Sequence, residues 1–586
     1  MENWNSIQNT LTLGRLSCCF ENREELPYRV SSLLPVNDRT EVEQAESYYK
    51  NRIEEARKSG EIIPFERLCA LCQYDVLVQK VLALALATYE YPELQDLYRS
   101  LGYHDGISLE LAAQLLSMET DVKVSFYEKR LAFQRLIRIL PPAGSKGSFS
   151  QGTFFLDERV YSYLCGENRI DEKLDFLTKV QPGAGNEVLW IHEKEAHRLQ
   201  QFLWQNAERI QLSGPEGVGK RHLVRYVCRQ MKFPVLEIDG RILLNLGEED
   251  LKGAVLRIGR EMLLLESALL IHGIPAVTKE FPMSGMKRFV RKVIEPLSDY
   301  GYPIFICSEA GADLVTASDR LIAEIELDEL NRNERIALWE GWLENYGISG
   351  VDTAVLSAKF RLNGREIQKA AERLAFLSQN EVLTEENISR ECMFVLPNAS
   401  MGNLKREKTS QTLEDLKLPE EQKKILKNIS SHIRYRHQVY DVWNLEKRYA
   451  YGKTVSALFT GPPGTGKTMA VHVLANMLSL PLYTVDLSQV IDKYIGETQK
   501  RLEEIFVIAE RSSSILFFGK RSEVNDSKDR YANAEVAYIL QRMEKYDGIV
   551  ILASNFQKNI DEAFMRRIRY LVHFEMPDEA VRKELW

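Results

Sequence analysis

Two glycine-rich segments of the sequence have the residue types and spacing that hold a chain of phosphates. The stronger one, GPPGTGKT at 461–468, satisfies the pattern G-x-x-x-x-G-K-[ST]. Glycines let backbone N–H groups converge on phosphate oxygens, and a following helix adds the positive end of its dipole. The Lys467 ammonium can reach the β- and γ-phosphates, and the Thr468 hydroxyl can ligate Mg²⁺. The expected nucleotide and Mg²⁺ site comprises Gly461, Pro462, Pro463, Gly464, Thr465, Gly466, Lys467, Thr468 and Met469.

An earlier and weaker copy of the pattern, GPEGVGKR, occupies 214–221. It keeps the key residues Gly214, Gly219 and Lys220. Arg221 stands where Ser or Thr is needed, and a guanidinium group cannot ligate Mg²⁺ because it only donates hydrogen bonds. His272 and Gly273 follow the next apolar strand, where an acidic pair would hold the metal. We expect no hydrolysis at this loop. Nucleotide binding without turnover and a purely structural role both stay open.

Each loop needs a strand before it and a helix after it, and the surrounding sequence predicts both. Gly461 follows Gly214 by 247 residues. The next apolar strands, ending at Ile271 and Phe518, each lie 57 residues beyond those glycines. The following strands lead to Glu309 and Asn555, 95 and 94 residues on. Matched landmarks at this spacing indicate two copies of one α/β module.

The hydrophobic periodicity divides the chain into five regions. A helical N-terminal domain comes first, followed by an α/β subdomain with the weaker loop and then a second helical region. A polar linker and lead-in then precede the second α/β subdomain. The predicted bounds are 1–185, 186–325, 326–397, 398–445 and 446–586.

Composition excludes some classes of protein. The 586 residues include 76 Lys plus Arg against 84 Asp plus Glu, a formal net charge of -8. This balance argues against a nucleic-acid partner, because phosphate affinity comes mainly from clustered positive charge. The sequence contains no apolar run near the ~20 residues of a membrane helix. Its N-terminus shows no secretory signal pattern. We expect a soluble cytoplasmic protein.

Four motifs of the second module resemble the AAA+ ATPases, in particular the katanin- and spastin-like group and its bacterial tandem relatives. FTGPPGTGKT is the first, and KYIGE at 493–497 resembles the central-pore loop of that family. Ala553-Ser554-Asn555 resembles the segment that positions the attacking water, and 560–567 resembles the arginine-finger segment. The likeness is strong over 415–586 and weaker over 186–395.

The resemblance implies a fold and a set of roles. The fold is a helical N-terminal domain followed by two P-loop AAA+ modules in a ring, usually a hexamer. Asn555 is expected to order the attacking water, while Arg566 and Arg567 act on the ATP of the neighbouring subunit. Lys493 and Tyr494 are expected to grip a protein substrate in the pore. The region 1–185 resembles a winged-helix-type domain, whose expected use is docking a protein substrate or adaptor.

The sequence departs from the family pattern at two places. Phe517-Phe518 runs directly into Gly519-Lys520, so the Walker B acidic pair is absent, and Glu523 or Asp526 is a weak substitute for it. The second module has only 125 residues after Gly461, too few for a helical lid, so the chain is expected to be a piece of a longer protein. In the first lid, Arg365 is the expected basic residue of the sensor-two helix.

Three functions remain in competition. The first is a ring-forming ATPase that remodels or threads proteins. The second is a nucleotide-gated scaffold or adaptor that assembles on ATP without turnover, which the missing acidic pair favours. The third is a nucleic-acid motor, against which the acidic balance and the Tyr494 loop argue.

Overall fold

A computed structural model describes the parts of the chain that contain its regular elements. These are residues 39–60, 63–72, 76–94, 98, 107–108, 136–140, 153–167, 169–180, 188–379, 381–396, 404–407, 410–437, 455–478, 480–486, 497–519, 538–539, 541–543, 546, 548–554, 566–577, 579 and 582–583. The chain divides into two compact units. The first is Met1–Pro215 with Lys220–Leu327, and the second is Glu216–Gly219 with Asp328–Trp586.

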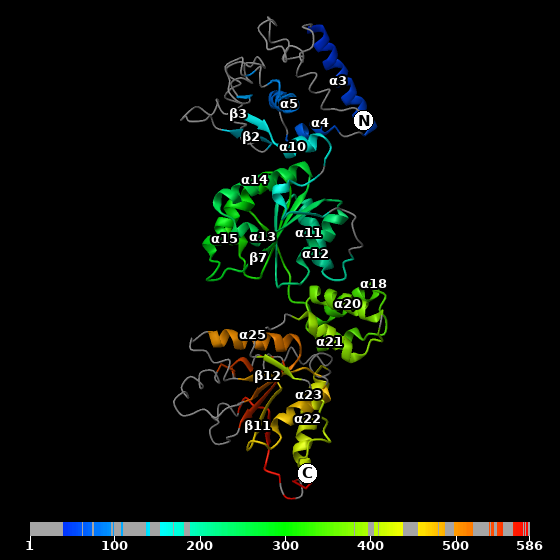
Figure 1. Cartoon of the computed structure of the whole chain (residues 1–586), viewed down its shortest axis with the longest axis vertical. Helices are drawn as coiled ribbons and strands as arrows, with labels where there is room; N and C mark the ends of the chain where they lie inside the picture. Colours follow the sequence, from blue (N-terminus) through cyan, green and yellow to red (C-terminus); the bar gives the residue numbers. More distant parts are fainter. Residues whose placement is uncertain are drawn as a thin grey trace. The chain divides into compact units, whose positions relative to one another are not determined.

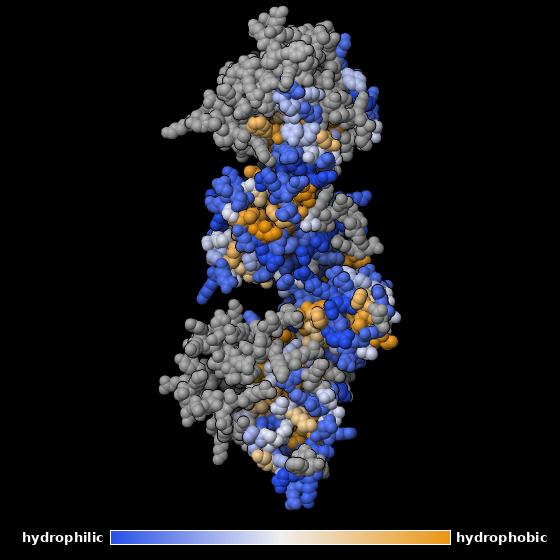
Figure 2. All heavy atoms as spheres, viewed as in Figure 1, coloured by the Kyte–Doolittle hydropathy of each residue, from blue (hydrophilic) through white to orange (hydrophobic). Residues whose placement is uncertain are grey.

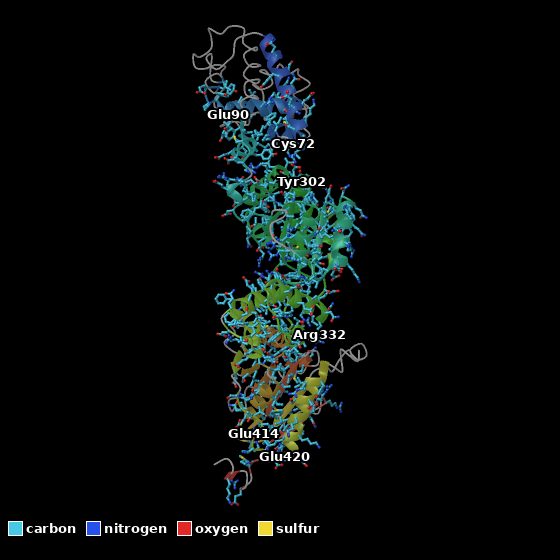
Figure 3. The ribbon with its side chains drawn as sticks, turned by 90° about the vertical axis from the view of Figure 1, so that its right-hand side faces the viewer. Cys72, Glu90, Tyr302, Arg332, Glu414 and Glu420 are labelled. Carbon is cyan, nitrogen blue, oxygen red and sulfur yellow. The ribbon has the colours of Figure 1, made fainter. Side chains whose placement is uncertain are left out.

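The N-terminal part of the first unit combines helices with a small antiparallel sheet (Figure 1). The sheet has the order β1-β3-β2, and α5 packs against β3. The apolar run of α5 is buried on all sides, from Val81 to Ala87. Figure 3 labels Cys72 and Tyr302, which both pack against this core. The elements are α3 (Arg39–Ser59), α4 (Pro64–Leu71), α5 (Val76–Glu90), β1 (Ile107–Ser108), β2 (Ile137–Leu140), β3 (Thr153–Leu156) and α10 (Glu158–Leu164).

The rest of the first unit is a parallel sheet with helices on its faces (Figure 1). Its strand order is β4-β6-β7-β8-β5-β9, with only β4 antiparallel to its neighbour. The strands are β4 (Thr178–Val180), β5 (Arg209–Ser213), β6 (Val235–Asp239), β7 (Ala268–Ile274), β8 (Ile304–Ser308) and β9 (Ala323–Glu326). The helices include α11 (Glu193–Trp204), α12 (Lys220–Gln230), α13 (Gly240–Asn245), α14 (Glu248–Leu264), α15 (Met283–Phe289), α16 (Glu295–Ser298) and α17 (Leu314–Ala317).

The second unit begins with a helical segment. Asn331 and Asn363 each form a capping box with a glutamate three residues on, which fixes the starts of α18 and α20. Apolar atoms reach the surface of this segment (Figure 2), and Phe376 is 73% exposed. The helices are α18 (Arg332–Asn345), α19 (Thr353–Lys359), α20 (Gly364–Ser378) and α21 (Glu385–Val395).

The second sheet repeats the strand order of the first. Its order is β10-β12-β13-β14-β11-β15, again with only its first edge strand antiparallel. The strand register repeats as well. Asp239 pairs with His272 in the first sheet, and the residues 247 positions later, Asp486 and Gly519, pair in the second. The elements are β10 (Leu404–Glu407), α22 (Glu420–His437), β11 (Val455–Thr460), α23 (Lys467–Leu478), β12 (Leu482–Asp486), α25 (Glu497–Arg511), β13 (Ile515–Gly519), β14 (Ile549–Ser554) and β15 (Tyr570–His573). The predicted α/β class with parallel sheets is confirmed.

Candidate nucleotide-binding site

The second glycine-rich loop connects a buried strand to a helix. Every residue of β11 is buried, and β11 lies between β14 and β15. The strand ends at Thr460, and α23 begins at Lys467. The predicted strand–loop–helix arrangement is therefore present, with the loop at the carboxyl edge of a parallel sheet. This edge is where α/β folds place their ligands.

Glycines of this loop adopt backbone conformations that other residues rarely reach. Gly461, Gly464 and Gly466 have φ angles of 140°, 81° and 93°. A Cβ on Gly461 would lie 2.0 Å from the carbonyl oxygen of Phe574. The amide of Phe574 in turn donates to the carbonyl of Thr460 at 2.7 Å. The start of the loop is thus held tightly against the end of β15, where only glycine fits.

Lys467 points back into the loop that precedes it. Its Nζ donates to the carbonyl oxygens of Gly461 and Pro462, each at 2.6 Å. The residue is 9% exposed, and burial lowers the pKa of its ammonium group. The Thr465 hydroxyl donates to the Pro462 carbonyl at 2.9 Å and closes the same turn. A phosphate placed in the loop would meet an ammonium group that is already held in position.

Thr468 and Met469 follow on the first turn of α23. Thr468 is exposed, so its hydroxyl is accessible, while Met469 is partly buried and packs against the core under the loop. An accessible hydroxyl beside the lysine is the ligand that a P-loop offers to Mg²⁺. These residues therefore fit a nucleotide with its metal ion.

Leu416 is a neighbour of the loop that sequence reasoning missed. It is 2% exposed, and its δ-carbon lies 3.7 Å from the position of a Cβ on Gly466. The segment around it is fixed by Thr412, whose amide donates to Asp415 at 2.7 Å. The available signal is the apolar spacing of Leu413, Leu416 and Leu418 within the predicted lead-in.

The other predicted site residues are only partly within the described chain. Asn555, Lys493, Tyr494, Glu523 and Asp526 lie outside the described residues. β14 ends at Ser554, directly before Asn555, and Ser554 pairs with Thr460 in register.

The two predicted arginine-finger residues, Arg566 and Arg567, lie within the described part of the chain. Arg566 and Arg567 are exposed in a turn before β15. The Arg567 carbonyl accepts from the Ser456 hydroxyl at 2.9 Å. The structure thus ties the backbone of this turn to β11, the strand that leads into the loop.

The first loop has the same backbone construction. Gly214 and Gly219 have φ angles of 143° and 111°, and a Cβ on Gly214 would lie 2.2 Å from the Leu327 carbonyl oxygen. Lys220 donates to the carbonyl oxygens of Gly214 and, at 2.7 Å, Pro215. Leu327 and Phe574 are again 247 residues apart. The two loops are therefore anchored at equivalent places.

The strands that should carry acidic pairs end without them. β13 ends in Phe517-Phe518-Gly519. In the first sheet, the position that corresponds to Gly519 is His272, which is followed by Gly273. Within the described ranges, the side chains form no group of three or more His, Cys, Asp or Glu residues that could hold a metal ion.

Two further predictions concern the lid and membrane helices. The guanidinium of Arg365 lies 3.9 Å from the carboxylate of Glu216, and both side chains are exposed. No helix among the residues that the structure covers is both long and apolar enough to cross a membrane.

Comparison with known families agrees with the geometry of the second loop. Residues 457–578 match the ATPase family associated with various cellular activities (AAA). This part of the chain is an AAA-family ATPase domain. Residues 37–177 match the winged helix domain, variant, so the predicted winged-helix character of the N-terminal region is confirmed.

Three curated relatives resemble the AAA domain. An uncharacterized AAA family ATPase, y4kL, of Sinorhizobium fredii is 32% identical over 133 residues, 21% of this chain and 40% of the relative. A 26S proteasome regulatory subunit 6B homolog of Encephalitozoon cuniculi is 32% identical over 140 residues, 22% of this chain and 36% of the relative. A cell division cycle protein 48 homolog of Archaeoglobus fulgidus is 35% identical over 139 residues, 22% of this chain and 19% of the relative. The chain thus spans two fifths or less of the length of these relatives.

Proposed function

We propose that this chain is an AAA+ ATPase that binds Mg-ATP at the second loop and remodels or threads protein substrates as a homo-oligomeric ring. The observation that carries the proposal is the placement of Lys467. Its buried ammonium faces the interior of a glycine loop between a parallel strand and a helix. Few other functions require a buried cation in such a loop.

The proposed roles follow from the chemistry of each residue. Backbone amides of Gly461–Met469 hold the phosphates, Lys467 pairs with the β- and γ-phosphates, and Thr468 ligates Mg²⁺. The metal supplies charge neutralisation between the phosphates when it is bound. Asn555 orders the attacking water. Arg566 and Arg567 belong to the neighbouring subunit's site, and their exposed position on a turn is compatible with reaching outward.

The wider assembly is part of the proposal. Relatives named as a proteasome regulatory subunit homolog and a cell division cycle protein 48 homolog support a ring, for which we propose a hexamer. The motif around Lys493 and Tyr494 supports a pore that grips protein and a place in the katanin- and spastin-like group. The winged-helix region supports docking of a protein substrate or adaptor in the cytoplasm.

The repeated strand order supports the proposed tandem arrangement. The N-terminal domain is 1–185, the first α/β subdomain 186–325, its lid 326–397, the lead-in 398–445, and the second α/β subdomain 446–586. β4 and β10 each add an antiparallel edge strand just before these α/β subdomains. In this arrangement the first module carries a degenerate loop and the second carries the ATP site.

A nucleotide-gated scaffold is the second candidate function. The observation that favours it is the end of β13, where Gly519 stands in place of an acidic residue. A carboxylate there would order the Mg²⁺ water shell and polarise the attacking water. Without it, ATP binding and assembly proceed while phosphate release is slow or absent.

One set of measurements tests both candidates. Mg-ATP binding, phosphate release and sedimentation in ATP are compared for the wild type, Lys467→Ala and the matched variant Lys220→Ala. If the chain is an ATPase, we expect phosphate release by the wild type that Lys467→Ala abolishes. The scaffold predicts ATP-dependent assembly, lost in Lys467→Ala, without release. Equal Mg-ATP binding by the wild type and Lys467→Ala would refute both.

A further inference from the structure

The first loop holds a charged cluster in the corner where a P-loop normally places its metal ion. Arg221 occupies the position that corresponds to Thr468 in the second loop, 247 residues later. Its Nη1 donates to Glu237 Oε1 at 3.1 Å and lies 3.4 Å from His272 Nε2. Glu237 comes from β6 and is 5% exposed. The guanidinium is thus fixed at the carboxyl edge of the sheet by a buried carboxylate.

A second arginine shares the same carboxylate. Arg225, one helical turn after Arg221 on α12, donates from Nε to Glu237 Oε2 at 3.0 Å and donates to it again from Nη2. The His272 imidazole lies 3.5 Å from Glu237. Burial, followed by the nearby Arg221, lowers the pKa of His272, which favours the neutral ring. Two guanidinium groups against one carboxylate leave the cluster with an excess of one positive charge.

These residues do not fit Mg²⁺. The ion prefers oxygen ligands, and the carboxylate of Glu237 already accepts from two arginines. Asp239, at the end of β6, accepts from Arg241 at 2.6 Å, and that hydrogen bond is the main cause of its lowered pKa. No hydroxyl replaces that of Thr468, because the side chain at this position is a guanidinium. A dication would also face the excess positive charge of the cluster.

We propose that the first loop binds a nucleoside di- or triphosphate without a divalent cation, with Arg221 in the metal's place. A guanidinium is always charged and presents donors in a fork that matches phosphate oxygens. The side chain of Arg221 is 41% exposed, so a phosphate can reach it. Lys220 precedes Arg221, and its Nζ donates to the Pro215 carbonyl of the loop, as Lys467 does to Pro462 in the second copy. This site holds its nucleotide without turnover, since no metal or acidic pair activates water.

The test uses the full chain with Lys467→Ala, which silences the second loop, and fluorescent ATP and ADP as probes. Binding is titrated in excess EDTA and in excess MgCl₂. The expected result is nucleotide binding in EDTA that is no weaker than in MgCl₂, because a site that excludes the dication competes with Mg²⁺ for the nucleotide's phosphates. Adding Arg221→Thr weakens the binding in EDTA by about tenfold or more, the worth of a hydrogen bond to a charged group. Adding Arg198→Thr, an arginine on α11, leaves it unchanged.

The outcomes separate this site from the second loop. Absence of binding by Lys467→Ala in both buffers, or binding that EDTA abolishes, would overturn the proposal. Arg221→Lys keeps the charge without the fork and, judged folded by circular dichroism, must also bind more weakly. Equal nucleotide binding by the wild type and by Lys467→Ala that persists in EDTA would refute the proposed second site and leave this one standing.

Discussion

The carboxylate of Glu366 accepts hydrogen bonds from the side chain of Arg511 and, at 2.9 Å, from the backbone amide of Asn363. Glu366 is 8% exposed and belongs to the capping box of α20, while Arg511 ends α25 of the second sheet. The amide of Arg361 also donates to the Arg511 carbonyl at 2.9 Å. One buried carboxylate therefore caps a helix of the helical segment and fixes that segment to the AAA domain.

Loss of the Arg511 guanidinium should loosen this joint. Arg511→Met leaves the Glu366 carboxylate buried with only its capping bond, and we expect a local loss of about 2 kcal/mol. Glu366→Gln keeps an acceptor for the cap and should cost less. Hydrogen exchange measures both effects as faster exchange at the start of α20 and the end of α25. Lys292→Met, which breaks an exposed pair with Glu248, should change nothing there. Equal protection in Arg511→Met and the wild type would contradict the prediction.

Gly461 should be irreplaceable by alanine, whereas Gly464 should tolerate the change better. In Gly461→Ala the new Cβ meets the Phe574 carbonyl oxygen at 2.0 Å, and the backbone of residue 461 must keep a φ of 140°. We therefore expect a loss of about 3 kcal/mol in the free energy of unfolding. In Gly464→Ala nothing lies within 4 Å, and only the strain of a positive φ remains, about 1 kcal/mol. Thermal unfolding of the two variants provides the comparison. A smaller loss in Gly461→Ala than in Gly464→Ala would show that the contact with β15 does not constrain the loop.

ATP binding at the second loop should weaken at alkaline pH. Burial lowers the pKa of Lys467, and a bound phosphate would raise it again by stabilising the charged form. Binding then takes up a proton, so affinity falls as the pH rises through the lowered pKa of the free protein. Calorimetry in buffers of different ionisation enthalpy measures that proton. In Lys467→Arg the cation does not titrate, and its affinity should be flat over the same range. Flat affinity in the wild type would rule out this coupling.

The winged-helix region should depend on a buried ion pair with the first sheet's helices. Nε of Arg159 donates to both carboxylate oxygens of Glu261, at 3.1 and 3.2 Å, and the two side chains are 6% and 0% exposed. Arg159→Met leaves a buried carboxylate without this partner and should destabilise the first unit by about 3 kcal/mol. Glu261→Gln should cost less, because a neutral amide still accepts. Calorimetric unfolding of both variants tests this order, with Arg67→Met of a more exposed pair as the control.

The same carboxylate should give the first unit a pH dependence. Burial raises the pKa of Glu261, although Arg159 and Arg260 oppose the shift. The folded state therefore holds the proton to a higher pH than the unfolded chain does. Stability should fall as the pH rises from the ordinary glutamate pKa through the raised one. Glu261→Gln should remove this slope, and an unchanged slope in that variant would assign it to other groups.

The nucleotide loop could be predicted from the sequence because its information is local. Eight consecutive residues at 461–468 specify glycine conformations, a cation and a hydroxyl, and the apolar run before them specifies the strand. The equal spacing of the two loops likewise predicted a repeat, and the repeated strand order agrees with it. Neither edge strand, β4 nor β10, was predicted, because antiparallel edge pairing depends on a partner far along the chain.

The sequence by itself thus determined the class of fold, the AAA-type loop and the placement of Arg221 where a P-loop carries Ser or Thr. It could not say what Arg221 contacts, since Glu237 and His272 lie 16 and 51 residues away. Only the sheet order, with β6 beside β7, brings those side chains to one edge. The joint between Glu366 and Arg511, 145 residues apart, is likewise a product of tertiary packing. Local pattern decides which group a residue offers, while chain folding decides which distant group it meets.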